Sequence, residues 1–555
     1  MGLFKTCALT TATLLAISVL SLSVCWIGLG HEHIPNRVVR AETIRNASYD
    51  FIIVGAGTAG SVLANRLSAN ANVSVLLIEA GDVFGAASVV PLLATTLQQT
   101  SSDWAFRTTP QKYSSRGLIN NQQFLPRGRS LGGSGQINYM LHFTGTGEDF
   151  ERWERLGAIG WGYEAMKPYR DGIERERNEG EACPTELRDD EIFELFVTTT
   201  ENVLSKAFTD AGAELGLANH NFNPARYTIR NGIRWSSYHE YLRPAFGRAN
   251  LHVLTNSVAQ RVIFDEAKRA VGVAVADSVD GTAIVINALR EVILSSGAFQ
   301  TPQLLKLSGV GPAAELKRHN VPLVHDAPQV GQNLFDHLNL PLYVSINASA
   351  SVTLNKIANL HSIWNYLKHG TGVFSSTAVA GIGSPRNANF GIILFGMGTV
   401  DEQALRHVSN MKQDSFQNFF PLHRNTTQEG FLFLSTCHQP KSRGAIYLRD
   451  RNAHSKPFIN PNYLKHPADI DCMTEAIRLA AKTAATEPFR RMNATIHWPR
   501  VRSCTNFGPF EEDFRTNRPS DRYLECILRV SALTGHHPGG TAAMGRGGVV
   551  DGQLR

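Results

Sequence analysis

The segment that most constrains the fold of this chain lies near its start and reads YDFIIVGAGTAGSVLANRLSANANVSVLLIEAG. Phe51–Val54 is a short apolar run suited to a buried parallel strand, and Val73–Ile78 is a second such run. Between them, Ser61–Ala69 is predicted to form a helix. The helix side chains expected to face inward are Val62, Leu63 and Leu67. A strand, a helix and a second strand in this order predict an α/β fold.

Three glycines open the predicted helix in a G-x-G-x-x-G pattern, at Gly55, Gly57 and Gly60. The first permits a tight turn, the second lets backbone approach a pyrophosphate, and the third allows close packing of helix against strand. The N-terminus of the helix also offers unpaired N–H groups to phosphates. Glu79 ends the second strand, where its carboxylate would bind an adenosine ribose and repel a 2′-phosphate, which disfavours NADP. Further ligand contacts are expected from Thr58, Ala59 and Ala80. The pattern predicts a dinucleotide site; the alternative is a tight turn without a ligand.

A second glycine-rich stretch reads LPRGRSLGGSGQINYM and contains Ser130, Gly132, Gly133, Ser134 and Asn138. So many glycines disfavour regular secondary structure and indicate that the backbone passes close to another group. Asn138 follows at a distance from which its amide could reach the same ligand. We expect this segment to contact the dinucleotide; the alternative is an ordinary glycine-rich surface loop.

Composition is that of a large globular protein. With 555 residues, of which 43% are hydrophobic and 18% charged, the chain can form two or more lobes around a large core. Its formal charge of +6 is small for this length, and no basic run is interleaved with aromatic residues. A nucleic-acid partner is therefore not expected. No two cysteines have CxxC spacing, and no metal site is predicted.

Residues 1–30 contain one lysine followed by an uncharged, mainly apolar stretch, which is the pattern of a secretory signal peptide. The stretch is also long enough to span a bilayer, so an uncleaved anchor is the alternative, and only then would a membrane be a partner. Asn-x-Ser/Thr sequons favour export and occur at Asn46, Asn72, Asn347, Asn425 and Asn493. These features predict a secreted protein.

Removal of the N-terminal segment would leave five cysteines, at Cys183, Cys437, Cys472, Cys504 and Cys526. Their odd number means that at least one stays unpaired within the chain. Cys504 and Cys526 flank a polar, proline-containing loop and are the candidate disulfide. Two free buried thiols are the alternative that their spacing leaves open.

Five blocks of the sequence, taken in order, resemble the glucose–methanol–choline (GMC) oxidoreductases, a family of FAD enzymes. The first two blocks are the glycine fingerprint with Glu79-Ala80-Gly81, and GRSLGGSGQIN. The other three are GAFQTPQLLKLSGVG at 297–311, VGQNLFDH at 330–337 and HPGGTAAMG at 537–545. Within the family, the likeness is greatest to the animal extracellular branch often labelled glucose dehydrogenase.

The resemblance implies an α/β fold in which a Rossmann-type FAD-binding lobe is interwoven with an α+β substrate lobe containing an antiparallel sheet. The FAD lobe would comprise residues 48–150, 225–335 and 530–555. The substrate lobe would comprise residues 151–224 and 336–529.

Other segments agree with parts of this architecture. The alternating pattern of residues 270–286 predicts a β-hairpin, and residues 469–489 form an amphipathic helical pattern. The segment NLHVLTNSVAQRVIFD resembles the family's strand after which the chain re-enters the FAD lobe. This likeness implies that Val258 lies near the adenine.

The segment TGHHPGGTAAMG contains the residues to which the resemblance assigns catalysis. Oxidation of an alcohol removes a hydride, which flavin N5 accepts, and a proton, for which the protein must supply a base. An imidazole suits this role because its unperturbed pKa is about 6.5. By the family pattern His537 is the base, His536 lies beside the isoalloxazine ring, and Thr541 caps a following helix. For His536 a packing or surface role is the alternative. The remaining histidines are expected to be structural, among them His142, His252, His337 and His438.

The family's chain continues beyond this motif to a second active-site His or Asn, whereas this sequence ends at Arg555. We therefore expect the C-terminal part of the FAD lobe to be incomplete. The predicted activity is FAD-dependent oxidation of an alcohol or sugar, with electrons passing to a quinone-like acceptor or to oxygen. A sugar or polyol is the first choice of substrate and a sterol alcohol the second. The alternatives are a truncated, non-catalytic secreted flavin- or substrate-binding protein, and an NAD-dependent dehydrogenase, which the later blocks disfavour.

Overall fold

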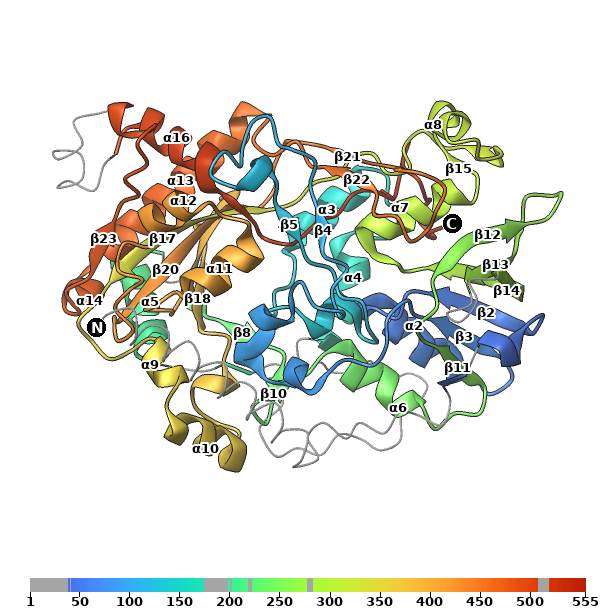
Figure 1. Ribbon diagram of the computed structural model, residues 1–555, viewed down its shortest axis with the longest axis horizontal. Coiled ribbons are helices and arrows are strands. Elements are labelled where there is room, and N and C mark those ends of the chain that lie inside the picture. Colours follow the sequence, from blue (N-terminus) through green and yellow to red (C-terminus); the bar gives the residue numbers. More distant parts are fainter. Residues whose placement is uncertain are drawn as a thin grey trace.

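The computed structural model describes residues 38–39, 41–173, 198–199, 202–217, 222–276, 283–507 and 519–555, and the structural statements below concern these residues. Two large sheets lie at opposite sides of the molecule, with helices and long connections between and around them (Figure 1). The predicted signal segment 1–30 and Cys183 lie outside the described residues. The proposed division into FAD and substrate lobes by residue range stays a prediction.

The first sheet, at the right of Figure 1, combines a parallel part with an antiparallel edge. Its strands, in spatial order, are β1 (Val38–Val39), β11 (Leu251–Leu254), β3 (Val75–Ile78), β2 (Ser48–Val54), β14 (Ala283–Leu294), β13 (Ala270–Ala276) and β12 (Ala259–Phe264). Neighbours from β1 to β14 are parallel, whereas β14, β13 and β12 pair antiparallel. The hairpin predicted for residues 270–286 is therefore confirmed as the β13–β14 pair.

Strands β2 and β3 are apolar along their whole length because both faces of the sheet are covered. Ile53 and Leu77 pack into one core cluster, and their neighbours Ile52 and Leu76 pack into a second cluster on the opposite face. Side chains alternate between the faces of a strand, so burial on both faces produces a continuous apolar run. This is why Phe51–Val54 could be recognised as a strand from the sequence.

Helix α2 (Thr58–Ser68) connects β2 to β3, but its buried face differs from the predicted one. The residues it buries are Gly60, Ser61, Ala64, Asn65 and Ser68. Leu63 and Leu67 are only partly buried at the margin of the adjoining cluster. The helix packs closely through small side chains, and Asn65 Nδ2 is satisfied by donating to Tyr241 O over 2.7 Å. The apolar positions alone therefore gave the inward face only in part, since Leu63 and Leu67 contact the core from its margin.

The second sheet, at the left of Figure 1, is antiparallel. Its strands, in spatial order, are β23 (Thr495–His497), β17 (Leu338–Ser345), β20 (Gly430–Cys437), β19 (Phe390–Phe395), β18 (Val379–Gly383) and β7 (Asn223–Pro224). A further short strand, β24 (Leu533–Thr534), also pairs with β17. The helix predicted at 469–489 is observed as α13 (Pro467–Ala484), which packs on β19 and β20, followed by the short α14 (Glu487–Arg490).

Two disulfides are formed among the described cysteines. The predicted Cys504–Cys526 pair is confirmed. A second pair, Cys437–Cys472, joins β20 to α13 and was not predicted, because these cysteines approach one another only after the helix packs on the sheet. Both pairs are of the kind that persists in oxidising compartments.

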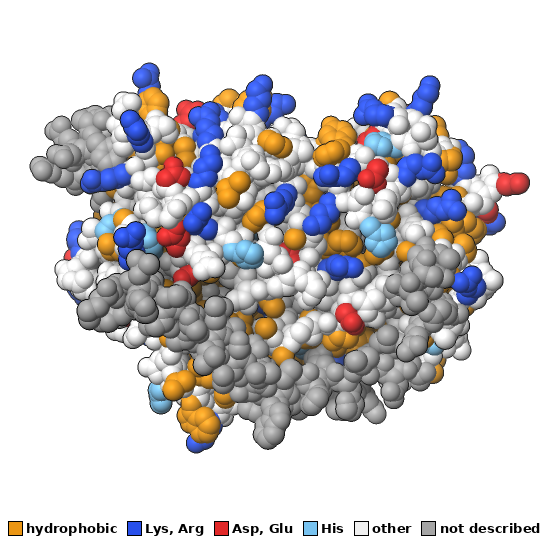
Figure 2. All heavy atoms as spheres, in the orientation of Figure 1, with side chains coloured by type: hydrophobic (Ala, Val, Ile, Leu, Met, Phe, Trp, Pro, Cys, Tyr) orange, Lys and Arg blue, Asp and Glu red, His pale blue; other side chains and the backbone are white. Residues whose placement is uncertain are grey.

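On the face shown in Figure 2, lysine and arginine side chains are spread across the width of the view, mostly in its upper half, and form no extended basic track. This scatter agrees with the modest formal charge of +6. Each helix in the described ranges is too short or too polar to cross a bilayer.

Candidate active site

The three fingerprint glycines are required for different reasons. Gly55 has φ +103°, and a Cβ there would lie 2.6 Å from Ser295 O. A Cβ on Gly60 would collide with Gly55 O. Gly57 differs, because it has φ −72° and its Cβ would approach only Gly133 Cα, at 3.9 Å. The chain itself therefore requires glycine at the first and third positions, whereas glycine at Gly57 keeps open the space beside the turn.

A cavity of about 280 Å³ lies beside this turn and the start of α7 (Gly297–Leu307). Nine of the predicted site residues line it: Gly55, Gly57, Thr58, Ala59, Glu79, Ala80, Gly133, Ser134 and Val258. Its size is near the lower end of the range for small-molecule sites, about 300–1,000 Å³. The structure therefore brings together the fingerprint, the acidic residue, the second glycine-rich segment and the residue expected near adenine.

The carboxylate of Glu79 lies in the cavity wall and is tied to the fingerprint turn. Its Oε2 accepts a hydrogen bond from Ala56 N at 3.0 Å, and its Oε1 accepts one from Gly81 N at 2.9 Å. Only 6% of the residue is exposed, and this burial raises the pKa of Glu79 to about 7. Glu79 thus shapes the turn in addition to facing the cavity.

The second glycine-rich segment is docked on the fingerprint. Gly132, at φ +91°, donates from its N–H to Ala56 O at 2.8 Å, and a Cβ on Gly133 would lie 2.6 Å from Gly57 Cα. The expectation of wholly irregular structure is wrong here, because Gly133–Gln136 form a short 3-10 helix. The close contact explains the glycines: larger residues would separate the two turns.

Asn138 and Ser130 lie outside the cavity wall. Asn138 Oδ1 accepts hydrogen bonds from Arg234 Nη1 at 2.6 Å and from Met140 N at 3.0 Å, which indicates a role in supporting the loop. The hydroxyl of Ser130 is buried without a hydrogen-bond partner in the described structure. Ser130 lies in the chain between Gly128 and Gly133, which both line the cavity.

The paired histidines follow β24 on a loop that is anchored to a buried carboxylate. Asp336, which is 5% exposed, accepts a hydrogen bond at Oδ1 from His537 N at 2.7 Å. Its Oδ2 accepts from Thr534 Oγ1 at 2.6 Å and from Tyr463 Oη at 2.5 Å. Thr534 Oγ1 in turn accepts from His536 N at 2.9 Å. The loop backbone is therefore fixed at two successive residues.

Arg127 connects this histidine loop to the cavity. Its guanidinium lines the cavity, and Nη2 donates to His536 O at 2.6 Å. His536 has φ +63°, a left-handed conformation that is uncommon for residues other than glycine and indicates a constrained loop. Burial lowers the pKa of His536 to about 3, and its Nδ1 is buried without a hydrogen-bond partner in the described structure.

His537 faces a second histidine that the sequence had assigned a structural role. The Nδ1 atoms of His337 and His537 lie 3.1 Å apart, and His337 Nε2 lies 2.8 Å from His438 O. The ring of His537 reaches solvent, yet desolvation by its surroundings, followed by the charge effect of His337, lowers its pKa to about 4. His537 is therefore neutral near pH 7, as a proton acceptor must be.

Sequence reasoning missed three residues of this arrangement: Arg127, Asp336 and His337. A signal for two of them was available, because Asp336 and His337 end the block VGQNLFDH, one of the five that carry the family resemblance. The predicted helix cap at Thr541 is wrong. Its Oγ1 donates to Ala298 O at 2.6 Å, and no helix follows in residues 541–555.

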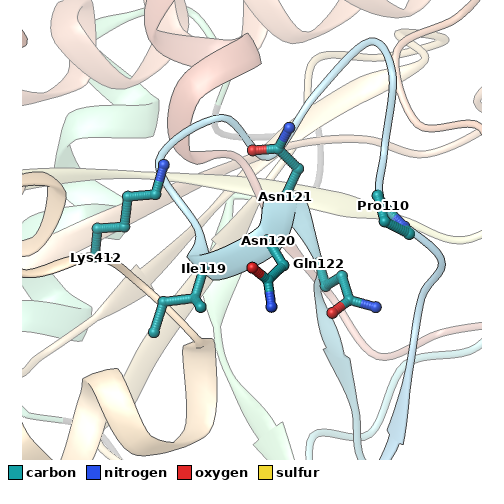
Figure 3. Close-up of a pocket in the computed structure, with 6 residues that line it drawn as sticks. All are labelled: Pro110, Ile119, Asn120, Asn121, Gln122 and Lys412. Carbon is teal, nitrogen blue, oxygen red and sulfur yellow. The ribbon is translucent and has the colours of Figure 1, made fainter.

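A second hollow, of about 740 Å³ and more open, lies elsewhere on the molecule (Figure 3). The residues that line it are Pro110, Ile119, Asn120, Asn121, Gln122 and Lys412. None of them is a predicted site residue, and Lys412 Nζ is engaged with Arg116 O at 2.8 Å. Nine of the predicted site residues thus lie at the cavity beside the fingerprint, whereas His536 and His537 lie outside its wall and are linked to it through Arg127.

The fold and the cavity are those expected of a nucleotide-binding α/β protein, with a loop of two histidines joined to the cavity wall through Arg127. Two family models described as GMC oxidoreductase match the chain, the N-terminal one over residues 49–339 and the C-terminal one over residues 440–555. The chain belongs to the GMC oxidoreductase family. Because the second match extends to residue 555, it gives no support to the predicted missing segment.

Relatives and solved structures agree with this membership. The chain is 38% identical to Neither inactivation nor afterpotential protein G of Drosophila melanogaster, over 98% of this chain and 89% of the relative. It is 34% identical to Alcohol dehydrogenase [acceptor] of Pseudomonas putida (90% and 86%) and 30% identical to Glucose dehydrogenase [FAD, quinone] of Drosophila melanogaster (90% and 78%). The crystal structure of formate oxidase has a similar fold, with TM-score 0.71, 24% identity and 92% of each chain covered.

The cofactor of this family is FAD, and the residues present fit it. The cavity meets the N-terminus of α2, where the backbone N–H groups of Thr58 and Ala59 suit phosphates and no side chain caps the helix. The open space beside Gly57 and the carboxylate of Glu79 suit a pyrophosphate and a ribose. The buried Nδ1 of His536 has no hydrogen-bond partner among the described residues, and Arg127 joins the backbone of His536 to the cavity wall.

Proposed function

We propose that this protein oxidises the CH–OH group of an alcohol or sugar, with His537 as the base that accepts the hydroxyl proton. Bound FAD supplies the hydride acceptor. The β2–α2–β3 unit is proposed as the Rossmann-type part of its site. The observation that carries the proposal is the contact of Arg127, a residue of the cavity wall, with the loop of the two histidines.

The residues of the chain have separable tasks in this reaction. His537 is neutral near pH 7, so it accepts the proton as the hydride leaves carbon. Asp336 and Arg127 hold the backbone of its loop on either side, which limits the freedom of the imidazole. A base held in place in this way avoids the entropic cost of being positioned during the reaction.

The proposed substrate is a sugar or polyol, with a sterol alcohol as second choice, and the proposed electron acceptor is a quinone-like compound or oxygen. The names of two relatives, an alcohol dehydrogenase with an acceptor and a glucose dehydrogenase with FAD and quinone, support these classes. A screen of alcohols with a dye acceptor, in air and without oxygen, tests both choices. Turnover of no alcohol by FAD-loaded protein would favour the alternative of a non-catalytic binding protein.

The role of His537 is tested by anaerobic reduction of the flavin. His537→Ala is expected to keep FAD bound and to slow reduction by the substrate by roughly 10²- to 10⁴-fold, the range for a lost general base. Raising the pH should restore part of the rate, because hydroxide or substrate alkoxide replaces the base. His325→Ala is the matched control, since His325 is exposed on the short strand β16 (His325–Asp326). Unchanged reduction in His537→Ala would refute the assignment.

The location of the FAD site is tested at Gly57. Gly57→Glu places a carboxylate beside the phosphate position of the helix N-terminus, so the purified protein is expected to lose its flavin absorbance. The substitution should be tolerated by the fold, because little of the chain surrounds a Cβ there. Gly85→Glu is the control, since a Cβ at Gly85 meets no atom within 4 Å. Normal FAD content in Gly57→Glu would place the site elsewhere.

Export of the protein, with residues 1–30 as a cleaved signal, remains a proposal. All five sequon asparagines are exposed, and the two disulfides suit an oxidising compartment. Expression in a secretory host is expected to give a protein without its first residues and with mass that a glycosidase removes. An intact N-terminus on a membrane-bound product would indicate an anchor, and unglycosylated cytosolic protein would contradict export.

A further inference from the structure

His337 lies between the proposed base and a backbone carbonyl. Its Nε2 is 2.8 Å from His438 O, and its Nδ1 is 3.1 Å from Nδ1 of His537. Both distances are those of hydrogen bonds. The three residues therefore form a chain that ends on an atom that can only accept a hydrogen bond.

That carbonyl determines where the protons of both rings lie. Because His438 O has no hydrogen to donate, Nε2 of His337 must carry the hydrogen. In the neutral form of His337 the imidazole has a single N–H, so Nδ1 is then an acceptor. The hydrogen of the contact at 3.1 Å then belongs to Nδ1 of His537. It follows that Nε2 of His537 carries the lone pair.

We propose that His337 is a positioning residue, which holds His537 in the Nδ1–H tautomer so that Nε2 is the atom that accepts the substrate proton. This inference rests on the proposed function for its catalytic consequence, whereas the tautomer itself is a property of the chain. In the step, the substrate O–H bond breaks and the Nε2–H bond of His537 forms. The proton on Nδ1 stays where it is, and its hydrogen bond to His337 stabilises the resulting imidazolium.

The backbone holds the two rings in register. Phe335 and Gly539 exchange two hydrogen bonds, with Phe335 N to Gly539 O at 3.1 Å and Gly539 N to Phe335 O at 3.0 Å. Gly535 N donates to His337 O at 2.7 Å. The two segments thus pair antiparallel on both sides of the histidines, which fixes the face that each ring presents to the other.

The space between the two rings is also specified. A Cβ on Gly535 would lie 3.2 Å from Nδ1 of His537 and 3.3 Å from Cβ of His337, so glycine leaves room for the pair. Oδ1 of Asp336 accepts from both backbone N–H groups, His337 N at 2.9 Å and His537 N at 2.7 Å. A single carboxylate oxygen therefore fixes the backbone positions of the two histidines relative to one another.

The charged groups around the pair agree with one shared proton between the Nδ1 atoms. If both rings were protonated, two N–H groups would point at one another over 3.1 Å. The positive charge of Arg127 lowers the pKa of His537, and the negative charge of Asp336 raises it. Burial lowers the pKa of the neighbouring His438. The contact between the two Nδ1 atoms therefore holds a single hydrogen.

The tautomer is measured directly by ¹⁵N NMR of FAD-loaded protein labelled at histidine, without any substrate. We expect His537 to show a protonated Nδ1 and an unprotonated Nε2. In His337→Phe, which keeps a ring but lacks the acceptor, the proton of His537 should move mainly to Nε2. In His337→Asn, whose Oδ1 takes the place of Nδ1, the wild-type pattern should return.

Kinetics of flavin reduction supply the functional test. His337→Phe should retain FAD and lower the maximal reduction rate by roughly 10- to 100-fold, as for other residues that orient a ligand or base from behind. Its pH profile should differ from that of the wild type, because the acceptor that keeps the hydrogen on Nδ1 of His537 is lost. His337→Asn should recover most of the rate, and the control His325→Phe should match the wild type.

The outcomes separate this inference from the proposed function. An Nε2–H tautomer in the wild type would overturn the inference, whatever the activity. Equal reduction rates and equal pH profiles in the wild type and His337→Phe would overturn it as well. An Nδ1–H tautomer that depends on His337, in a protein that oxidises no alcohol, would uphold the positioning role and refute the proposed function instead.

Discussion

The buried carboxylate of Asp336 is the best point at which to perturb the histidine loop. Four donors converge on it: the backbone N–H groups of His337 and His537, at 2.9 and 2.7 Å, and the hydroxyls of Thr534 and Tyr463, at 2.6 and 2.5 Å. Asp336→Asn keeps the shape of the side chain but replaces one acceptor oxygen by an NH₂ group.

The magnitude follows from this arrangement. The amide oxygen can still accept from both backbone N–H groups, so the NH₂ faces the hydroxyls of Thr534 and Tyr463. Thr534 Oγ1 already accepts from His536 N, so to accept from the NH₂ as well its hydroxyl hydrogen must turn away and lose its present acceptor. Hydrogen bonds to charged groups contribute about 1.5–3 kcal/mol each and neutral ones about 0.5–1.5 kcal/mol. Loss of two of the charged type should lower the free energy of unfolding by about 3–6 kcal/mol.

Urea unfolding of FAD-loaded protein measures this change, and flavin reduction should slow in parallel because the backbone of His537 loses an anchor. Asp401→Asn is the matched control: Asp401 accepts one hydrogen bond, from Ala404 N, as the N-cap of α11 (Glu402–Ser409). Asparagine caps a helix about as well as aspartate, so this variant should unfold like the wild type. A loss below about 1 kcal/mol in Asp336→Asn, with normal flavin reduction, would refute the reasoning.

Three further predictions concern stability. Burial raises the pKa of Glu79 from 4.5 to about 7. In FAD-free protein this group should therefore add about 3 kcal/mol to the free energy of unfolding below pH 4.5, and this contribution should be lost as the pH rises through 7. Urea titrations across this range should show the loss, and Glu79→Gln should remove it. Lys306 and Glu315 form a buried ion pair at 2.8 Å. Glu315→Leu leaves the lysine buried without its partner, so it should lower the free energy of unfolding by about 3–5 kcal/mol in the same assay. Lys306→Met combined with Glu315→Leu should cost less, and an equal cost would contradict the pairing argument. Cys504 and Cys526 close a loop with a sequence separation of 22, so replacing both by serine should lower the free energy of unfolding by about 3 kcal/mol. Calorimetry should then show a lower Tm. An unchanged Tm would show that the bond does not constrain the unfolded chain.

Local patterns determined much of the first sheet. The apolar runs in β2 and β3 and the glycines of the turn between β2 and α2 were readable because they report on a few successive residues: both faces of the strands are covered, and Gly55 needs a positive φ. The face of α2 was not readable in this way. Its inward positions hold Ser61, Ala64 and Asn65, since close packing on the sheet selects small size over apolarity.

The two disulfides likewise differ in whether their pairing could be predicted from the sequence. Cys504 and Cys526 could be paired because they flank one loop, whereas Cys437 and Cys472 meet only when α13 packs across β20. Nothing in the spacing of the latter pair distinguishes it from two free thiols.

By itself, the sequence determined the nucleotide-binding turn, the family and the identity of the histidine proposed as base, because each is carried by a contiguous motif. Only the tertiary structure decided what surrounds that histidine. His337 and Arg127 lie far from His537 along the chain, and the pairing of β17 with β24 brings the first of them within 3.1 Å of it. Hydrogen bonds and desolvation act over a few ångströms in space, so the tautomer and the pKa of His537 depend on neighbours that no local pattern reveals.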